Sequence, residues 1–106
     1  MRSPKVYIVN DTGQDYTKAC AFGELSVVVL GKVNPFQPQT VQQRIAEQLA
    51  AFDPEVDYLL PSGSALANGL AFAHVAGWLT TDEKNRVKLL MYDSKTDQYH
   101  ARSVEL

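Results

Sequence analysis

The sequence predicts a small α/β fold of the Rossmann-like or flavodoxin-like type, in which three layers are built around a mainly parallel β-sheet. Three observations lead to this expectation. Short β-prone runs alternate with helical patterns along most of the chain. One run, residues 25–33, is apolar almost without interruption, as is typical of a strand covered on both faces. The last two runs flank a short polar turn, which predicts a C-terminal antiparallel hairpin.

The size and composition predict one α/β domain over residues 1–106. The chain is 45% hydrophobic and 21% charged, as is usual for a globular domain. Its formal net charge of −2 argues against a broad nucleic-acid-binding surface, so nucleic acid is not an expected partner. The single cysteine, Cys20, cannot form an internal disulfide, and we expect it to be a small buried side chain.

No segment of the sequence has the pattern of a membrane or export signal. No apolar stretch approaches the roughly 20 residues that a membrane-spanning helix needs. The N-terminal residues lack the apolar core of a signal peptide. We therefore expect a cytoplasmic protein without membrane contact.

The first third of the chain predicts a strand, a short helix and a second strand. The first strand covers residues 5–9, where aromatic and β-branched residues precede a polar turn. A short helix follows over residues 15–22, with Asp15 as its N-cap. The second strand covers residues 25–33, and the prolines within residues 34–38 indicate a loop.

A clear amphipathic helix is predicted next, over residues 40–52. Apolar residues recur there at every third or fourth position, which gives the helix one apolar stripe. Thr40 is expected to cap it, with Gln43 in the capping-box position. A very short strand over residues 57–60 follows.

The second long helix, residues 64–79, differs from the first because it is apolar around most of its circumference. A helix of this kind is usually buried on more than one side. In so small a domain, this pattern predicts self-association, most simply as a homodimer. The residues expected to take part are Leu70, Phe72 and Trp78.

The end of the chain completes the order β-α-β-α-β-α-β-β. Residues 86–93 and 98–104 are β-prone, and residues 94–97 between them are typical of a turn. The competing interpretation is an α+β fold, in which residues 15–22 form only a loop.

The carboxyl ends of the parallel strands predict where a ligand would bind, because open parallel sheets bind ligands beyond these ends. Three polar loops should meet there, at residues 10–14, 31–34 and 61–64. The candidate ligand-binding residues in them are Asn10, Asp11, Asn34, Ser62, Gly63 and Ser64.

The turn Pro-Ser-Gly-Ser at residues 61–64 leaves two interpretations open. Hydroxyls, a glycine and a helix start are the features that phosphate-binding loops use. The same residues make a tight strand-to-helix turn without any ligand, with Ser64 as the N-cap. Because the turn matches neither the P-loop nor the dinucleotide-binding motif, the structural interpretation is favoured.

No catalytic residue set, metal site or cofactor motif is evident. Ser62 lacks the G-x-S-x-G context of a nucleophile, and His74 would lie far along a helix from it. The histidines and the cysteine are isolated, without the spacing of a zinc site. Asp11 and Asp15 could hold Mg²⁺ together with a phosphate ligand, but aspartates are equally common as turn and cap residues.

Two functions from different classes therefore remain open. The favoured one is a non-catalytic interaction or accessory module that self-associates and contacts another protein. The alternative is a protein, either a binding protein or an enzyme, that binds a nucleotide or phosphate ester with the loops at the carboxyl ends of the strands.

Overall fold

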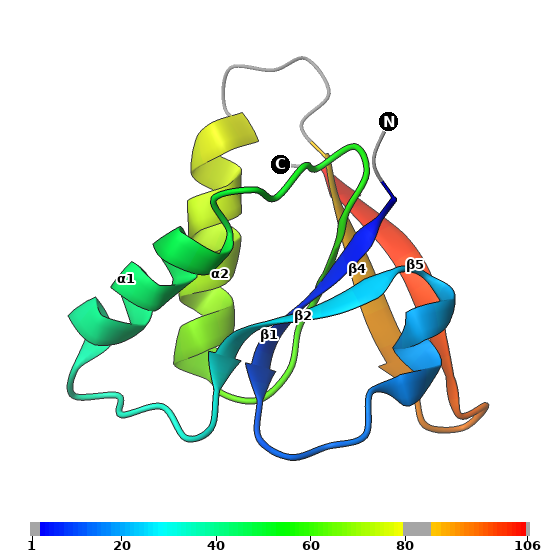
Figure 1. The fold of residues 1–106 in the computed structure, drawn as a ribbon, viewed down its shortest axis with the longest axis horizontal. Helices are drawn as coiled ribbons and strands as arrows, with labels where there is room; N and C mark the ends of the chain where they lie inside the picture. Colours follow the sequence, from blue (N-terminus) through cyan, green and yellow to red (C-terminus); the bar gives the residue numbers. More distant parts are fainter. Residues whose placement is uncertain (1–2, 80–85, 106) are drawn as a thin grey trace.

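The chain folds as a five-stranded mixed sheet with two α-helices on one face (Figure 1). The computed structural model describes residues 3–79 and 86–105, and only the backbone of residues 78 and 79. The strands are β1 (Lys5–Asp11), β2 (Glu24–Leu30), β3 (Tyr58–Leu60), β4 (Arg86–Asp93) and β5 (Gln98–Glu105), and the helices are η1 (Thr17–Ala21), α1 (Pro38–Gln48) and α2 (Ala65–Leu79).

The strand order in the sheet is β2-β1-β3-β4-β5. β1 is parallel to both β2 and β3, and β3 is parallel to β4. β4 and β5 form the antiparallel hairpin that the sequence predicted. The prediction of an α/β fold is thus confirmed, whereas the mainly parallel, three-layer form is matched only in part.

Alternation along the strands divides the core into two clusters. Tyr7 and Val9 of β1 face the side that α1 and α2 cover. Val6 and Ile8 face the other side, where η1 supplies Ala19. Because side chains alternate between the faces of a strand, the unbroken apolar run of β1 serves both clusters.

The layer opposite the α-helices is thinner than the sequence predicted. Instead of an α-helix over residues 15–22, the segment forms the short 3₁₀-helix η1, with Tyr16 rather than Asp15 at its N-cap position. Asp15 instead accepts a hydrogen bond from the backbone N–H of Thr17 (2.9 Å). The expectation for Cys20 was wrong: it is exposed, because the short helix turns its neighbour Ala19 towards the sheet.

Three predicted boundaries are also shifted. α1 begins at Pro38 rather than Thr40, since proline suits the first helical position, where no N–H acceptor is needed. The same helix ends at Gln48, before Phe52, which is nevertheless buried in the core. β2 ends at Leu30 because Gly31 adopts a positive φ of 84°.

The start of α2 agrees with the sequence. Ser64 precedes it, and its hydroxyl accepts a hydrogen bond from the N–H of Ala67 (3.3 Å), so the predicted cap is confirmed. Ala67, Ala71 and Val75 form the buried side of the helix. Within residues 3–79 and 86–105, no helix is long and apolar enough to span a bilayer.

Candidate functional site

Asn10, at the end of β1, joins the three loops that the sequence predicted to meet. It is 1% exposed, and its amide NH₂ donates to the carbonyl oxygens of Val29 (3.1 Å) and Gly31 (2.8 Å). Its Oδ1 accepts from the N–H of Ser64 (2.8 Å). Its backbone N–H donates to the Ser62 hydroxyl (3.3 Å), which in turn donates to the Asn10 carbonyl (3.0 Å). Asn10 therefore connects the loops at the carboxyl end of the sheet.

Gly63 fits this arrangement because it has no side chain. Its φ is +68°, and a Cβ built there would lie 2.7 Å from the carbonyl oxygen of Asn10. Positive φ favours glycine, and so close an approach excludes any larger residue without movement of the backbone. The turn and Asn10 are thus packed directly against each other.

The hydrogen bonds of this turn bear on the phosphate interpretation. The N–H of Ser62 donates to Oδ1 of Asn68 (3.0 Å), and the amide of Asn68 donates to the carbonyl oxygens of Ser62 and Ser64 (both 2.7 Å). The N–H of Ser64 is already bonded to Asn10. An anion-binding site needs free N–H groups, whereas the N–H groups of Ser62 and Ser64 both donate within the protein. The geometry therefore favours a structural turn.

A pocket of about 570 Å³ lies in front of the turn, at the carboxyl ends of the strands. We call it the rim pocket. Its walls come from the segment around η1, the turn after β3 and the β4–β5 hairpin. The lining residues are Gln14, Asp15, Tyr16, Lys18, residues 60–63, Tyr92, Asp97 and Tyr99. Ser62 and Gly63 line this pocket, whereas Asn10 and Ser64 do not.

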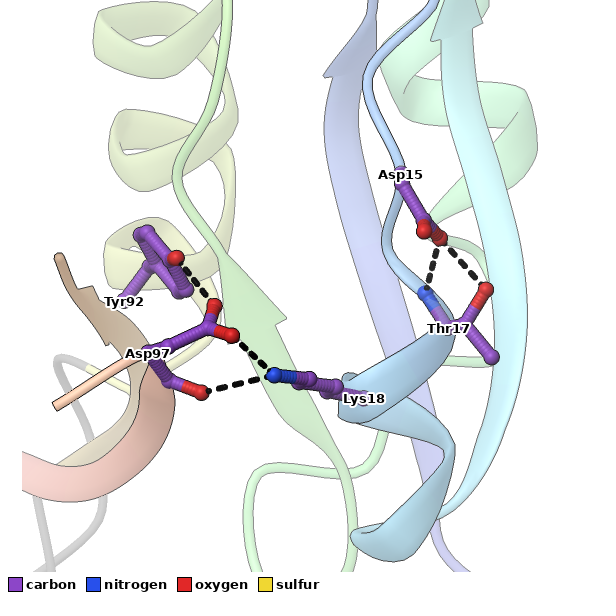
Figure 2. Close-up of polar contacts among 5 residues, drawn as sticks. All are labelled: Asp15, Thr17, Lys18, Tyr92 and Asp97. Atoms are coloured by element: carbon purple, nitrogen blue, oxygen red, sulfur yellow. Dashed lines mark hydrogen bonds and ion pairs between the residues drawn. The ribbon is translucent and has the colours of Figure 1, made fainter.

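Three residues that line the rim pocket form a charged network (Figure 2). Lys18 of η1 forms an ion pair with the carboxylate of Asp97 in the hairpin turn, and it also donates to the Asp97 carbonyl (3.2 Å). The hydroxyl of Tyr92 donates to the other carboxylate oxygen of Asp97. Asp97 itself has a positive φ of 55°, which aspartate tolerates better than most residues. This network joins the first and last thirds of the chain.

The network shifts the pKa of both hydrogen-bonded partners. The hydrogen bond from Lys18, followed by that from Tyr92, holds the pKa of Asp97 below its ordinary value of 3.8. The same carboxylate raises the pKa of Tyr92 above 10.0, because it accepts a hydrogen bond from the phenol and so favours its protonated form. Burial raises the pKa of Tyr99, whose ring centroid lies 5.2 Å from that of Tyr92.

The charge of the rim pocket does not suit a phosphate. Asp15 and Asp97 contribute two carboxylates, and Lys18 contributes one cation that already pairs with Asp97. The hydrogen bonds from the Thr17 hydroxyl and N–H lower the pKa of Asp15, so this carboxylate stays ionised near neutral pH. A phosphate entering the pocket would meet an excess of negative charge.

Two of the predicted residues lie elsewhere. Asn34 borders a separate pocket beside β2, and its Oδ1 accepts from the N–H of Phe36 (3.0 Å). Asp11 bends back on its own loop and accepts from the N–H of Gly13 (2.8 Å). The part of the chain that the structure describes contains no group of three histidine, cysteine or acidic residues placed to hold a metal ion.

The residues predicted for self-association are only partly on the surface. Leu70 and Phe72 are half-buried and pack against the core cluster beneath α2. The side chain of Trp78 lies outside the described residues. Over residues 65–77, the exposed side of α2 consists instead of Ala65, Gly69, Ala73 and Gly77.

Sequence reasoning identified the turn after β3 but missed the network of Lys18, Tyr92 and Asp97. Lys18 and Asp97 lie 79 positions apart, so no local pattern connects them. The one usable signal was the aspartate at the end of a four-residue turn, because that position commonly requires a left-handed backbone.

These observations define a small α/β protein with a mixed sheet and a polar pocket at the carboxyl ends of its strands. The family model described as "Phage Pam3 gp32-like protein" matches residues 4–106, and the chain therefore belongs to this family. No curated protein and no solved structure matches the chain.

Proposed function

We propose that this phage-family protein is a non-catalytic interaction module that self-associates through the exposed side of α2. The observation that carries the proposal is the composition of this helix, which has no charged residue over residues 65–79. Over residues 65–77, its exposed positions recur every fourth residue and are all alanine or glycine. A Cβ built on Gly69 would meet nothing within 4 Å, so there is open space at the middle of this side of the helix.

The neighbouring helix α1 supports the proposal by contrast. It packs beside α2 on the same face of the sheet (Figure 1), but its exposed positions include four glutamines, Arg44 and Glu47. A helix that faces water alone normally carries such residues. Small residues along α2 would let a second α2 approach to about 8 Å between axes, which is the close end of helix packing. A second copy of this chain is therefore the occupant that we propose.

Matched alanine substitutions on the two helices test this proposal. Ala73→Glu places a carboxylate in the middle of the exposed side of α2, and Ala46→Glu does the same on α1. Burying an unpaired carboxylate costs roughly 3 kcal/mol, so Ala73→Glu should raise the dimer dissociation constant by about 100-fold. Ala46→Glu should leave it unchanged.

Sedimentation velocity over a range of protein concentrations measures the dissociation constant, and circular dichroism checks that both variants fold. A wild-type protein that is monomeric at high micromolar concentration would rule out self-association. Equal weakening by both substitutions would place the contact away from α2.

A cytoplasmic location is part of this proposal and is supported by the lack of any disulfide pair in the sequence.

A second candidate function is the binding of a nucleotide or phosphate ester in the rim pocket. Three parallel strand pairs and the strand order β2-β1-β3-β4 support a reduced flavodoxin-like plan, in which ligands bind at the carboxyl ends of β1 and β3. The rim pocket lies at this place and includes Ser62 and Gly63. We rank this function second because the carboxylates of the rim pocket would repel a phosphate and the N–H groups of Ser62 and Ser64 already donate within the protein.

Thermal unfolding in the presence of nucleotides, phosphate and phosphate esters distinguishes the two functions. A ligand present at 100 times its dissociation constant should stabilise the protein by about 2.7 kcal/mol. Stabilisation that is lost in Lys18→Met would support the phosphate function. A panel without any shift would leave self-association as the function to pursue.

A further inference from the structure

The two edge strands of the sheet differ in how they are protected. β5 forms one edge and carries charged residues, among them Glu105, which pairs with Arg86 of β4 (3.2 Å). β2 forms the other edge and has a single charged residue, Glu24, at its first position. Proteins commonly place charges on edge strands to prevent pairing with other chains. Within the described ranges, β2 pairs only with β1, so its outer side is open to an additional strand.

The carboxyl end of β2 adds an exposed apolar surface. The side chain of Leu30, the last residue of the strand, is 73% exposed, and Phe36 in the following loop is 90% exposed. Four large hydrophobic side chains among the described residues are exposed, and the two most exposed of them lie on this short segment. Large apolar side chains on an exposed surface often mark an interaction site.

A second pocket, of about 230 Å³, lies between this end of β2 and the first turns of α1. We call it the edge pocket. Val29, Val33 and Val41 give it an apolar base, and Lys32 and Arg44 stand at its border. Its lining includes no carboxylate, and no ion pair of either cation occurs in the described part of the chain. The edge pocket can thus accept an apolar side chain beside a carboxylate.

We propose that β2 binds an extended acidic peptide segment of another protein as an additional strand. Backbone hydrogen bonds to β2 would supply affinity, as in β-strand addition generally. An apolar side chain of the peptide would enter the edge pocket, and a neighbouring carboxylate would lie between Lys32 and Arg44. This interface is separate from the exposed side of α2 and does not depend on self-association.

The surroundings of β2 favour a single peptide over a second copy of the chain. α1 packs against one face of β2 and η1 against the other, so both flank the open edge. A lone strand requires little room between these flanks, whereas a second sheet would bring its own helices against them. A β2–β2 pair would also offer each edge pocket only Glu24 for its two cations.

The test uses two capped synthetic peptides of eight residues, in which valine alternates with threonine. One carries two aspartates and a leucine at one end, and its counterpart carries lysines in place of the aspartates. Calorimetric titration should show binding of the acidic peptide and at least about tenfold weaker binding of the basic one. Amide hydrogen exchange should slow in β2 and remain unchanged in β5.

Charge-reversal variants locate the acidic end of the peptide. Lys32→Glu and Arg44→Glu should each weaken binding of the acidic peptide about tenfold, whereas Lys95→Glu, an equal change in the hairpin turn, should have little effect. Equal binding of both peptides, equal effects of all three variants, or protection confined to β5 would overturn the proposal. Protection of the β2 amides that increases with protein concentration in the absence of peptide would also overturn it, because a second copy of the chain would then occupy the edge.

Discussion

Two buried polar residues hold opposite ends of the sheet, and they do so with different chemistry. Asn10 lies at the carboxyl end of β1 and Asp57 immediately before β3, at the amino end, with 1% and 0% of their surfaces exposed. The carboxylate of Asp57 accepts from the backbone N–H groups of Lys5 (2.9 Å) and Asp53 (2.8 Å). Asn10 both donates and accepts, and it joins three loops.

The difference follows from what each end of the sheet presents. Two N–H groups converge on Asp57, and an ionised carboxylate only accepts hydrogen bonds. At Asn10, two carbonyl oxygens and one N–H converge, which requires two donors and one acceptor on the same side chain. Each end of the sheet therefore selects one of two nearly isosteric residues. Among the described residues, the hydrogen bonds of Asn10 join three loops at the carboxyl end, where the rim pocket lies.

The largest expected effect comes from Gly63→Ala, which would break the carboxyl end. The added Cβ combines a strained positive φ with a clash against the Asn10 carbonyl, and together these should lower the free energy of unfolding by about 4 kcal/mol. Urea denaturation followed by circular dichroism measures the loss. Gly13→Ala is the control, since its φ is also positive (+103°) but its Cβ meets nothing within 4 Å, so it should cost only about 1 kcal/mol. Similar stabilities of the two variants would contradict this account of the turn.

Exchange of the amide for a carboxylate at Asn10 should cost nearly as much. Asn10→Asp keeps an acceptor for Ser64 but removes both donors and places an oxygen against two carbonyl oxygens. Leaving buried polar groups unsatisfied should cost about 3 kcal/mol in the same urea experiment. Asn10→Ala should be no more destabilising than Asn10→Asp. An aspartate variant as stable as the wild type would show that the donors contribute nothing.

The reverse exchange at the amino end should be milder. Asp57→Asn retains one side-chain acceptor, so one of the two N–H groups of Lys5 and Asp53 loses its partner, at a cost of about 1.5 kcal/mol. In a domain of this size, that loss should lower the melting temperature by about 6–12 °C. Differential scanning calorimetry of Asp57→Asn and Asn10→Asp compares the two ends directly. A larger drop for Asp57→Asn would reverse the ranking of the two ends.

The sequence was sufficient for features that local pattern determines. Alternating β-prone and helical segments predicted the α/β order, the polar turn at residues 94–97 predicted the hairpin, and Ser64 predicted the start of α2. The segment around residues 15–22 was too short for its pattern to distinguish an α-helix from η1. Proline at position 38 acted as a helix start, although its effect on the preceding residue suggested a loop.

The candidate site was less predictable because its contacts join distant parts of the chain. Asn10 was expected to face a ligand, yet it holds Gly31 and Ser64 and does not line the rim pocket. A polar residue that ends a fully apolar strand run could have indicated such a buried role. The pairing of Lys18 with Asp97 gave no sequence signal, since it depends on how the hairpin lies over η1.

The smallest effect concerns the network of Lys18, Tyr92 and Asp97, which lines the rim pocket. Since the folded-state pKa of Asp97 is lowered, its ionisation contributes stability above pH 3.8 that is lost as the pH falls through the folded value. Since the pKa of Tyr92 is raised, its protonated form contributes below pH 10.0, and this is lost as the pH rises through the folded value. Both groups are exposed, so the effect on unfolding should be slight, and NMR titration of the carboxyl and phenol carbons is the direct measurement.

Lys18→Met should return the pKa of Asp97 towards 3.8, and Asp97→Asn should lower the pKa of Tyr92. Titration curves unchanged in both variants would show that the pairing does not persist in solution, and the rim pocket would then have a mobile wall opposite the fixed frame around Asn10.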